Sequence, residues 1–208
     1  RVDAPAKWRS MPERVREAAS LKVTTPKALK AKLRPYQQTG FEWLARTAHW
    51  STGAILADDM GLGKTVQAIA LILHRLKQGP VLVVCPTSVA FNWERELASF
   101  APSLTSRIYP GRDTALAEEA LTNGQVTIVS YDLLALYGER FKTVKWGTIV
   151  VDEAQAFKNP QTKRARAVFD LQGDFVLALT GTPIENRSFE AWSLFRAIAP
   201  GYLGSLDQ

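Results

Sequence analysis

The chain has 208 residues, of which 46% are hydrophobic, and it carries a formal net charge of +6 and a single cysteine, Cys85. This length and composition suffice for one domain with a full core. A lone cysteine in the apolar run VLVVCP excludes a disulfide framework. Two isolated histidines, His49 and His74, argue against a protein-bound zinc site. No segment approaches the ~18 to 20 apolar residues of a membrane helix and the N-terminus lacks a signal-peptide layout, so we expect a soluble, cytoplasmic protein with no membrane partner.

The first 34 residues carry the excess positive charge. They hold ten Lys and Arg against three acids, a net of +7, whereas the remaining 174 residues hold 16 bases and 17 acids, a net of −1. Two interpretations stay open: a solvated basic leader, or an arm that binds a polyanion. We assign residues 1–30 to a basic leader or linker and residues 31–208 to a folded domain.

From Leu33 onward, amphipathic helices alternate with apolar strands. Helix signals run from Pro35 through FEWLARTA, and from Lys64 through VQAIALILHRLK to the stop at Gly79-Pro80. Several expected strands are apolar on successive residues, which is typical of strands buried on both faces of a parallel sheet, so we predict an α/β layered domain. The expected strands are 53–58, 81–85, 105–109, 126–130, 148–152 and 175–180.

The stretch ADDMGLGKT, residues 57–65, follows the first expected strand and opens the second expected helix. Backbone N–H groups at a helix start attract anions, and ligands of open α/β sheets bind beyond the carboxyl ends of the strands. We expect Lys64 to reach the β- and γ-phosphates of a nucleotide and Thr65 to ligate Mg²⁺. Asp58 stands where the usual G-x-x-x-x-G-K-[ST] pattern has its first glycine. The predicted phosphate loop comprises Asp58, Met60, Gly61, Leu62, Gly63, Lys64 and Thr65.

The stretch TIVVDEAQ supplies the second half of a nucleotide site. Asp152 ends an apolar strand, where a carboxylate can hold Mg²⁺ through its water shell, and the adjacent Glu153 is placed to orient or deprotonate the attacking water. An acid pair at a strand end is weakly specific by itself. Together with the phosphate loop upstream, it predicts a nucleotide hydrolase.

Six ordered motifs carry a resemblance to a known family. They are LRPYQQTGFEWL, LADDMGLGKTVQAIAL, VLVVCPTSVAFNWERE, TIVSYDLL, IVVDEAQAFKNP and LALTGTPIENRSFEAWSLF. In this order and spacing, about residues 31–204 resemble the first RecA-like lobe of the Swi/Snf-type ATPases, the superfamily-two motors of chromatin remodellers and their bacterial relatives. The resemblance implies a RecA-like P-loop NTPase lobe with a mostly parallel sheet between two helix layers, and members commonly carry an acid at the position of Asp58.

The resemblance also implies roles for single residues. Gln37 matches the glutamine that reads adenine, so the nucleotide is expected to be ATP. The residues implied in catalysis are Lys64, Asp152, Glu153 and Gln155. Those that couple the γ-phosphate to lobe movement are Thr180, Gly181 and Thr182. Those that grip the nucleic-acid backbone are Pro86, Thr87, Ser130 and Tyr131.

Two departures from the common family pattern look bacterial. Gln155 stands where many eukaryotic members have histidine, and Glu185 stands where many have glutamine. They favour the bacterial cytoplasm or nucleoid and weaken any expectation of a nucleosome substrate. Three tryptophans on the expected helices, Trp43, Trp93 and Trp192, are expected in the core or in lobe packing instead of stacking on bases.

The function that the resemblance implies is ATP-dependent translocation on double-stranded DNA, which remodels protein–DNA complexes. A motor that acts on RNA polymerase or another DNA-bound protein is the first alternative, and a non-catalytic nucleotide-binding module is the second. Family motors have a second RecA-like lobe, which supplies an arginine to the site. We expect the 208 residues to be one lobe of a longer protein, and almost inactive alone.

Overall fold

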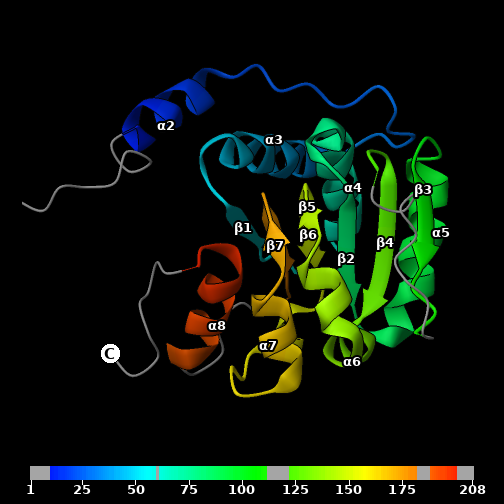
Figure 1. Ribbon diagram of the computed structural model, residues 1–208. Coiled ribbons are helices and arrows are strands. Elements are labelled where there is room, and N and C mark those ends of the chain that lie inside the picture. Colours follow the sequence, from blue (N-terminus) through cyan, green and yellow to red (C-terminus); the bar gives the residue numbers. More distant parts are fainter. Residues whose placement is uncertain (1–9, 60, 112–121, 182–187, 201–208) are drawn as a thin grey trace, which may run out of the picture.

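The fold centres on one six-stranded sheet in which every pair of neighbouring strands is parallel (Figure 1). The computed structural model describes residues 10–59, 61–111, 122–181 and 188–200. In spatial order the strands are β1 (Gly53–Leu56), β8 (Val176–Leu179), β6 (Thr148–Val151), β2 (Val81–Cys85), β4 (Gln125–Ser130) and β3 (Thr105–Ile108). Parallel strands need crossover connections, so the helices between them cover the sheet on both faces.

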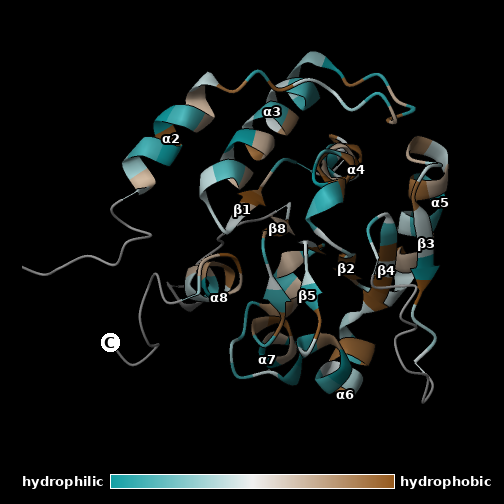
Figure 2. Ribbon diagram, turned by 45° about the horizontal axis from the view of Figure 1, so that its top comes forward, coloured by the Kyte–Doolittle hydropathy of each residue, from teal (hydrophilic) through white to brown (hydrophobic). Residues whose placement is uncertain are grey.

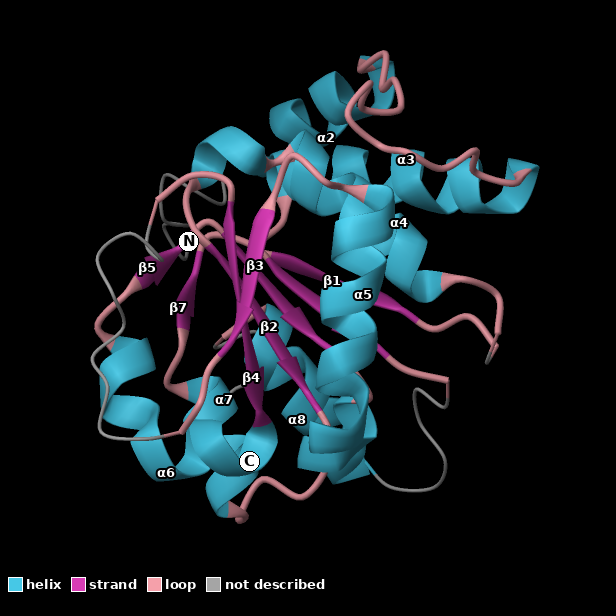
Figure 3. Ribbon diagram, turned by 90° about the vertical axis from the view of Figure 1, so that its right-hand side faces the viewer, coloured by secondary structure: helices cyan, strands magenta, loops and turns pink. Residues whose placement is uncertain are grey.

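Helices of the described segments cover both faces of this sheet, with one layer on each face (Figure 3). One layer consists of α3 (Pro35–Trp50), α4 (Lys64–His74) and α5 (Ala90–Phe100). The other consists of α6 (Tyr131–Lys142), α7 (Lys163–Phe169) and α8 (Ser188–Ile198). Short elements complete the order: the 3₁₀ turns η1 (Leu76–Gln78), η2 (Thr87–Val89) and η4 (Ala154–Phe157), and the paired strands β5 (Lys145–Trp146) and β7 (Gln172–Gly173).

Strand β2 shows why the apolar runs predicted a doubly covered sheet. Val81, Val83 and Cys85 pack into the core beneath α3, α4 and α5, whereas Leu82 and Val84 pack into the core beneath α6, α7 and α8. Alternate residues of a strand point to opposite faces, so both sets must be apolar. The expected burial of Cys85 is confirmed, and this burial raises the pKa of its thiol to about 12.

The predicted fold class, a mostly parallel sheet between two helix layers, is confirmed. Every expected strand forms, with its ends shifted by at most two residues, and both expected helices begin at Pro35 and Lys64 as predicted. The second helix ends at His74 and continues as the turn η1. Strands β5 and β7 were not expected, because two-residue strands have no periodicity to detect. Within the described segments, no helix is both long and apolar enough to cross a membrane.

The basic N-terminal segment is packed against the domain from residue 10 onward. It contains a helix that was not expected, α2 (Met11–Ser20), which is mostly hydrophilic and lies against α3 (Figure 2). Ala18 and Leu29 are buried, and the backbone N–H of Lys30 donates to the carbonyl of Phe100 at 2.7 Å. The division at residue 30 stays a prediction, but the structure shows no break in packing there.

A buried arginine holds the end of α4 against the start of the sheet. The Arg75 side chain is 7% exposed; its Nη2 donates to a carboxylate oxygen of Asp174 at 2.6 Å and to the carbonyl of Gly147 at 3.0 Å. Its Nε donates to the hydroxyl of Thr148 at 3.1 Å, and its guanidinium lies 5.0 Å from the ring centroid of Phe175. One side chain thus links α4 to the segments that precede β6 and β8.

Replacing Arg75 with Ala should lower the free energy of unfolding by about 2 to 4 kcal/mol, because buried acceptors lose a charged donor. The control is Arg46→Ala, which removes an ion pair with Glu42 within α3 whose side chains are 35% and 29% exposed. That loss should stay under about 1 kcal/mol. Urea unfolding of the 208-residue chain measures both, and equal losses would show that Arg75 has no special structural role.

Candidate nucleotide site

The register of the sheet brings the ends of β1, β8 and β6 side by side. Leu56 pairs with Leu179, and Ala178 pairs with Val151, so the segments that follow these strands leave the sheet at nearly the same level. They are the predicted phosphate loop, the segment that begins at Thr180, and the acid pair. Parallel pairing therefore gathers three motifs that are far apart in the sequence at the carboxyl edge where ligands of such sheets bind.

The phosphate loop turns sharply into α4. Gly61 and Gly63 have φ of +83° and +77°, a left-handed conformation that L side chains rarely adopt. Gly63 is the residue before α4, and no side chain caps this helix start. The Lys64 ammonium donates to the carbonyls of Asp58 and Asp59 at 2.7 and 3.1 Å. The loop thus presents an uncapped helix N-terminus beside a positive charge, which suits an anion.

Asp58 has a structural role in the loop. Its carboxylate accepts a hydrogen bond from the amide of Gln67 at 3.1 Å, and Gln67 is fully buried in the second turn of α4. This contact ties the start of the loop to the helix that the loop opens. Gly40 of α3 makes room for Gln67, because a Cβ there would lie 2.1 Å from the Gln67 Oε1 atom. An aspartate replaces the usual first glycine and fixes the loop through its side chain.

Gln37 lies beside the phosphate loop, as the resemblance implied. Its Nε2 donates to the carbonyl of Leu62 at 3.0 Å, and its Oε1 accepts from the backbone N–H of Arg34 at 2.9 Å. A Cβ on Gly63 would lie 2.4 Å from the Gln37 Nε2, so this contact also depends on glycine. The structure brings Gln37 to the loop, and its contact with adenine stays a prediction.

The carboxylate of Asp152 is held by two donors. The indole Nε1 of Trp93 donates to its Oδ2 at 2.8 Å, and the backbone N–H of Glu153 donates to its Oδ1 at 2.9 Å. The hydroxyl of Tyr131 donates to the Asp152 carbonyl at 2.7 Å. Burial raises the pKa of the Asp152 carboxyl, against the lowering effect of the two hydrogen bonds. Burial also raises the pKa of Tyr131 well above its usual range, so this phenol stays a donor.

Glu153 has a left-handed backbone, with φ of +50°, and it is the one non-glycine residue with positive φ in the described segments. Such a conformation costs about 1 to 2 kcal/mol and is held here by the hydrogen bonds on both sides of the Asp152–Glu153 peptide. Its carboxylate accepts a hydrogen bond from the Nε2 of Gln155. The Oε1 of Gln155 in turn accepts from the Thr180 hydroxyl at 3.1 Å. A polar chain thus joins the acid pair to the end of β8.

The structure brings most of the predicted nucleotide-site residues to one edge of the sheet. Gly181 follows Thr180 there, and Thr65 is the second residue of α4, partly exposed beside Lys64. Met60 and Thr182 lie outside the described residues. The remaining predicted members lie on α3, in the phosphate loop and at the start of α4, and in the segment that follows β6: Gln37, Asp58, Gly61, Leu62, Gly63, Lys64, Asp152, Glu153 and Gln155.

The four residues predicted to grip nucleic acid differ in accessibility. Thr87 is exposed and Pro86 is half-buried. The Ser130 hydroxyl caps α6 by accepting from the N–H of Leu133 at 3.3 Å, and the Tyr131 side chain is 3% exposed with its hydroxyl on Asp152. Tyr131 is thus almost inaccessible to a nucleic acid in this structure. Contact with nucleic acid stays a prediction for all four.

Two residues of the site were not assigned to it from the sequence. Trp93 was expected in the core, where it lies fully buried, but its bond to Asp152 was missed. Gln67 was missed because a glutamine among apolar residues gives no sign of its partner. Trp192 packs edge-on against Phe169, whereas Trp43 is 47% exposed on α3. Trp43 is therefore not a core residue of this domain, and its other expected role, in lobe packing, stays a prediction.

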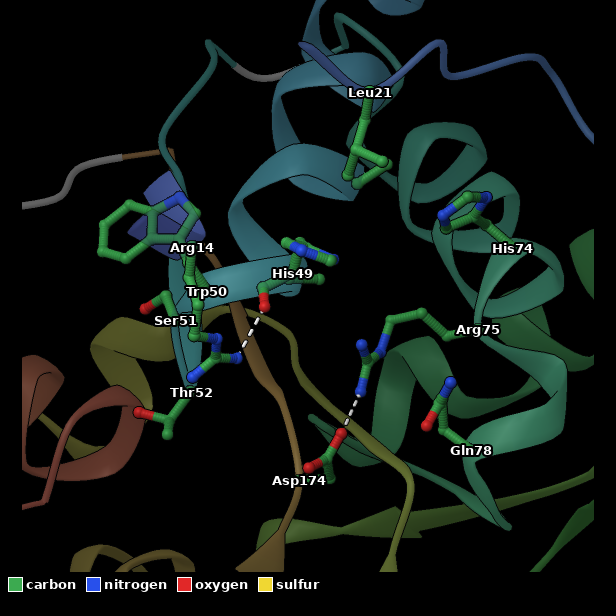
Figure 4. A pocket seen from close by; sticks show the side chains of 12 residues that line it. Arg14, Leu21, His49, Trp50, Ser51, Thr52, His74, Arg75, Gln78 and Asp174 are labelled. Atoms are coloured by element: carbon green, nitrogen blue, oxygen red, sulfur yellow. Dashed lines mark hydrogen bonds and ion pairs between the residues drawn. The ribbon is translucent and has the colours of Figure 1, made fainter. Parts of the chain in front are cut away.

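A separate cavity of about 350 Å³ opens at the other end of the sheet, where β1 and β8 begin (Figure 4). Its walls come from α2, the ends of α3 and α4, and the segment before β8. Arg14 donates to the carbonyl of His49 at 2.6 Å, and Arg75 pairs with Asp174. No residue predicted to bind nucleotide lines this cavity, so it is distinct from the candidate site.

The chain is similar to a SWI2/SNF2 ATPase core, to a bacterial protein named as a helicase/translocase, and to a TATA-binding protein-associated factor. It is 43% identical to the Sulfolobus solfataricus SWI2/SNF2 ATPase core in complex with dsDNA, with a TM-score of 0.80 over 89% of this chain and 39% of that one. It is 45% identical to the Bacillus subtilis protein YwqA, described as an ATP-dependent helicase/translocase, over 86% of this chain and 20% of YwqA. The TATA-binding protein-associated factor mot1 of Aspergillus fumigatus is 37% identical, over 92% of this chain and 11% of mot1.

These similarities span most of this chain but less than half the length of each of the three relatives. The SNF2-related domain family matches residues 36–208. Its match runs from the start of α3 to the last residue and includes the phosphate loop, the acid pair and the end of β8. The resemblance seen in the six motifs is thereby confirmed, and the chain belongs to the SNF2-related domain family of SWI2/SNF2 ATPases.

Proposed function

We propose that this chain is the ATP-binding lobe of a motor that hydrolyses ATP, moves along double-stranded DNA and remodels protein–DNA complexes. One observation carries the proposal. The phosphate loop, with its uncapped helix start, lies at the same edge of the sheet as the chain of hydrogen bonds from Asp152 to Thr180. The DNA complex of the Sulfolobus relative supports the choice of duplex as the track.

The phosphate loop fits the triphosphate of ATP. The start of α4 has backbone N–H groups without a capping side chain, and a Cβ built on Gly61 would meet no atom within 4 Å, so the loop faces open space. The Lys64 ammonium is held by two backbone carbonyls of its own loop. Phosphate oxygens would replace these neutral acceptors with charged ones, which form stronger hydrogen bonds with an ammonium.

The oxygen atoms at the site fit Mg²⁺, which prefers hydroxyl, carboxylate and water oxygens. Thr65 would ligate it directly, and Asp152 would hold it through water. Each Asp152 carboxylate oxygen accepts one hydrogen bond from the protein and keeps a lone pair for a water molecule. When bound, the ion would neutralise charge that develops on the β- and γ-phosphates.

Glu153 and Gln155 would control the attacking water. The carboxylate of Glu153 would accept a proton or a hydrogen bond from this water, and the amide of Gln155 fixes the carboxylate. Because Gln155 also accepts from Thr180, a change at the γ-phosphate would reach the end of β8. We favour a hydrolase over a non-catalytic nucleotide-binding module because Lys64, Asp152 and Glu153 are all present.

A second lobe would complete this site. The chain matches 39% of the Sulfolobus ATPase core, so in a protein of that plan most of the motor lies outside the matched part. The second lobe would bring an arginine to the phosphates, and such arginines contribute roughly 10³ to 10⁵ in rate in related P-loop enzymes. The whole motor would therefore hydrolyse ATP far faster than the 208 residues alone.

Replacing Lys64 with Ala should abolish measurable binding of Mg·ATP to the 208-residue chain, because the triphosphate loses its cation. The control is Lys77→Ala, an exposed lysine of η1 near the other end of α4. It should bind like the unchanged chain. Isothermal calorimetry measures all three proteins. Equal affinity of the Lys64 variant and the control would discard the phosphate loop as the nucleotide site.

Duplex DNA should stimulate ATP turnover of the full-length protein, while the 208-residue chain should turn over slowly with or without DNA. Phosphate release at saturating ATP is the measurement, and Glu153→Gln controls for contaminating enzymes. A full-length protein that ignores DNA contradicts the proposed track. A rate of ~1 s⁻¹ or more from the 208 residues alone, stimulated by DNA and dependent on Glu153, contradicts the need for a second lobe.

A further inference from the structure

Two aromatic side chains hold Asp152 from opposite faces of the sheet. Trp93 comes from α5 and belongs to the core beneath α3, α4 and α5, where it is fully buried. Tyr131 begins α6 and belongs to the core on the other face. The first donates to the Asp152 carboxylate at 2.8 Å and the second to the Asp152 carbonyl at 2.7 Å. The predicted magnesium acid is therefore clamped at its side chain and at its backbone.

Both clamping residues are close to the segments predicted to grip nucleic acid, and Tyr131 is itself a member of one of them. The turn η2 (Thr87–Val89) runs without a break into α5, so Trp93 lies about one helical turn beyond it. Ser130 caps α6, and Tyr131 follows it directly. Each predicted DNA segment is thus within about one turn of a hydrogen bond to Asp152.

The surroundings of the clamp allow little independent movement. Trp93 and Tyr131 are 0% and 3% exposed, and close-packed cores transmit displacement instead of absorbing it. The sheet register also fixes where the three segments begin, because Cys85 pairs with Ser130 and Val84 pairs with Val151. The segments after β6, β2 and β4 therefore leave the sheet side by side, and the segment after β2 is the direct neighbour of the acid.

We propose that Trp93 and Tyr131 are positioning residues that fix Asp152 for Mg²⁺ and pass the movement of the two DNA-contacting segments to it. This proposal rests on the proposed function, because it takes the segment after β2 and the segment after β4 to contact DNA. Binding of duplex would shift η2 and the start of α6, and the two hydrogen bonds would carry that shift to the acid. DNA would thereby tighten the hold on Mg·ATP.

The test compares Trp93→Phe and Tyr131→Phe, each of which removes one donor and keeps the ring. The matched control is Trp146→Phe: Trp146 is 1% exposed, and its indole donates to the Phe141 carbonyl at 3.0 Å, away from the candidate site. For the full-length protein, calorimetry gives the affinity for ATP in EDTA and in Mg²⁺, with and without duplex DNA. The ratio of the first two affinities is the magnesium gain.

Trp93→Phe should reduce the magnesium gain by about tenfold, the lower end of the loss seen when partners of metal ligands are removed. ATP affinity in EDTA should stay unchanged, and Trp146→Phe should match the unchanged protein. Tyr131→Phe should keep most of the magnesium gain. In this variant, the ratio of the affinities for Mg·ATP with and without DNA should fall close to one. A merely structural tryptophan would alter stability without this dependence on Mg²⁺.

The possible failures are distinguishable. An unchanged protein that binds no Mg·ATP overturns the proposed function and this proposal with it. A protein that binds Mg·ATP, with a magnesium gain that is equal in Trp93→Phe and Trp146→Phe, overturns this proposal alone. Urea unfolding checks that each variant is folded. If Trp93→Phe does not fold, the test rests on Tyr131→Phe. A Tyr131→Phe variant in which DNA still raises the affinity for Mg·ATP as much as in the unchanged protein would count against the proposal.

Discussion

The position of the Asp152 carboxylate is the constraint on which the rest of the site depends. It lies at the end of β6 between two strand ends, and its hydrogen bonds come from α5 and from the next residue, Glu153. These bonds offset part of the cost of burying a charge. They also hold Glu153 in its left-handed conformation, which brings its carboxylate to Gln155 and so to Thr180. A shift of the acid would therefore disturb the whole chain of hydrogen bonds from Asp152 to Thr180.

The phosphate loop is stabilised in a different way. Two glutamines outside the loop bind it: Gln67 of α4 donates to the Asp58 carboxylate, and Gln37 of α3 donates to the Leu62 carbonyl. The loop thus needs no ligand to hold its turn, and its helix N-terminus stays open. Such preorganisation lowers the entropic cost of binding, because the donors are already oriented. At the other end of the same helix, Arg75 fixes α4 to the sheet, so the loop stands on a rigid support.

Much of this arrangement could be predicted from the sequence because its signals are local. Runs of successive apolar residues marked the strands, and the glycines, Lys64 and the acid pair follow those strands directly. The bond from Trp93 to Asp152 joins residues 59 apart and leaves no trace in either motif. The helix α2 was hidden because it has few large apolar residues, and only packing against α3 identifies its buried side. What the sequence could not supply were contacts decided by the sheet register.

Because the Trp93 indole N–H is hydrogen-bonded to Asp152, its NMR resonance should report directly on the proposed magnesium site. A ¹⁵N-labelled chain gives one cross-peak for each tryptophan, and the Trp93→Phe variant identifies the one of interest. If Trp93 holds the proposed magnesium acid, its cross-peak should move when Mg·ADP binds and move much less with ADP in EDTA, while the Trp146 cross-peak stays in place. A Trp93 cross-peak that ignores Mg·ADP, or that moves equally without Mg²⁺, would contradict the account.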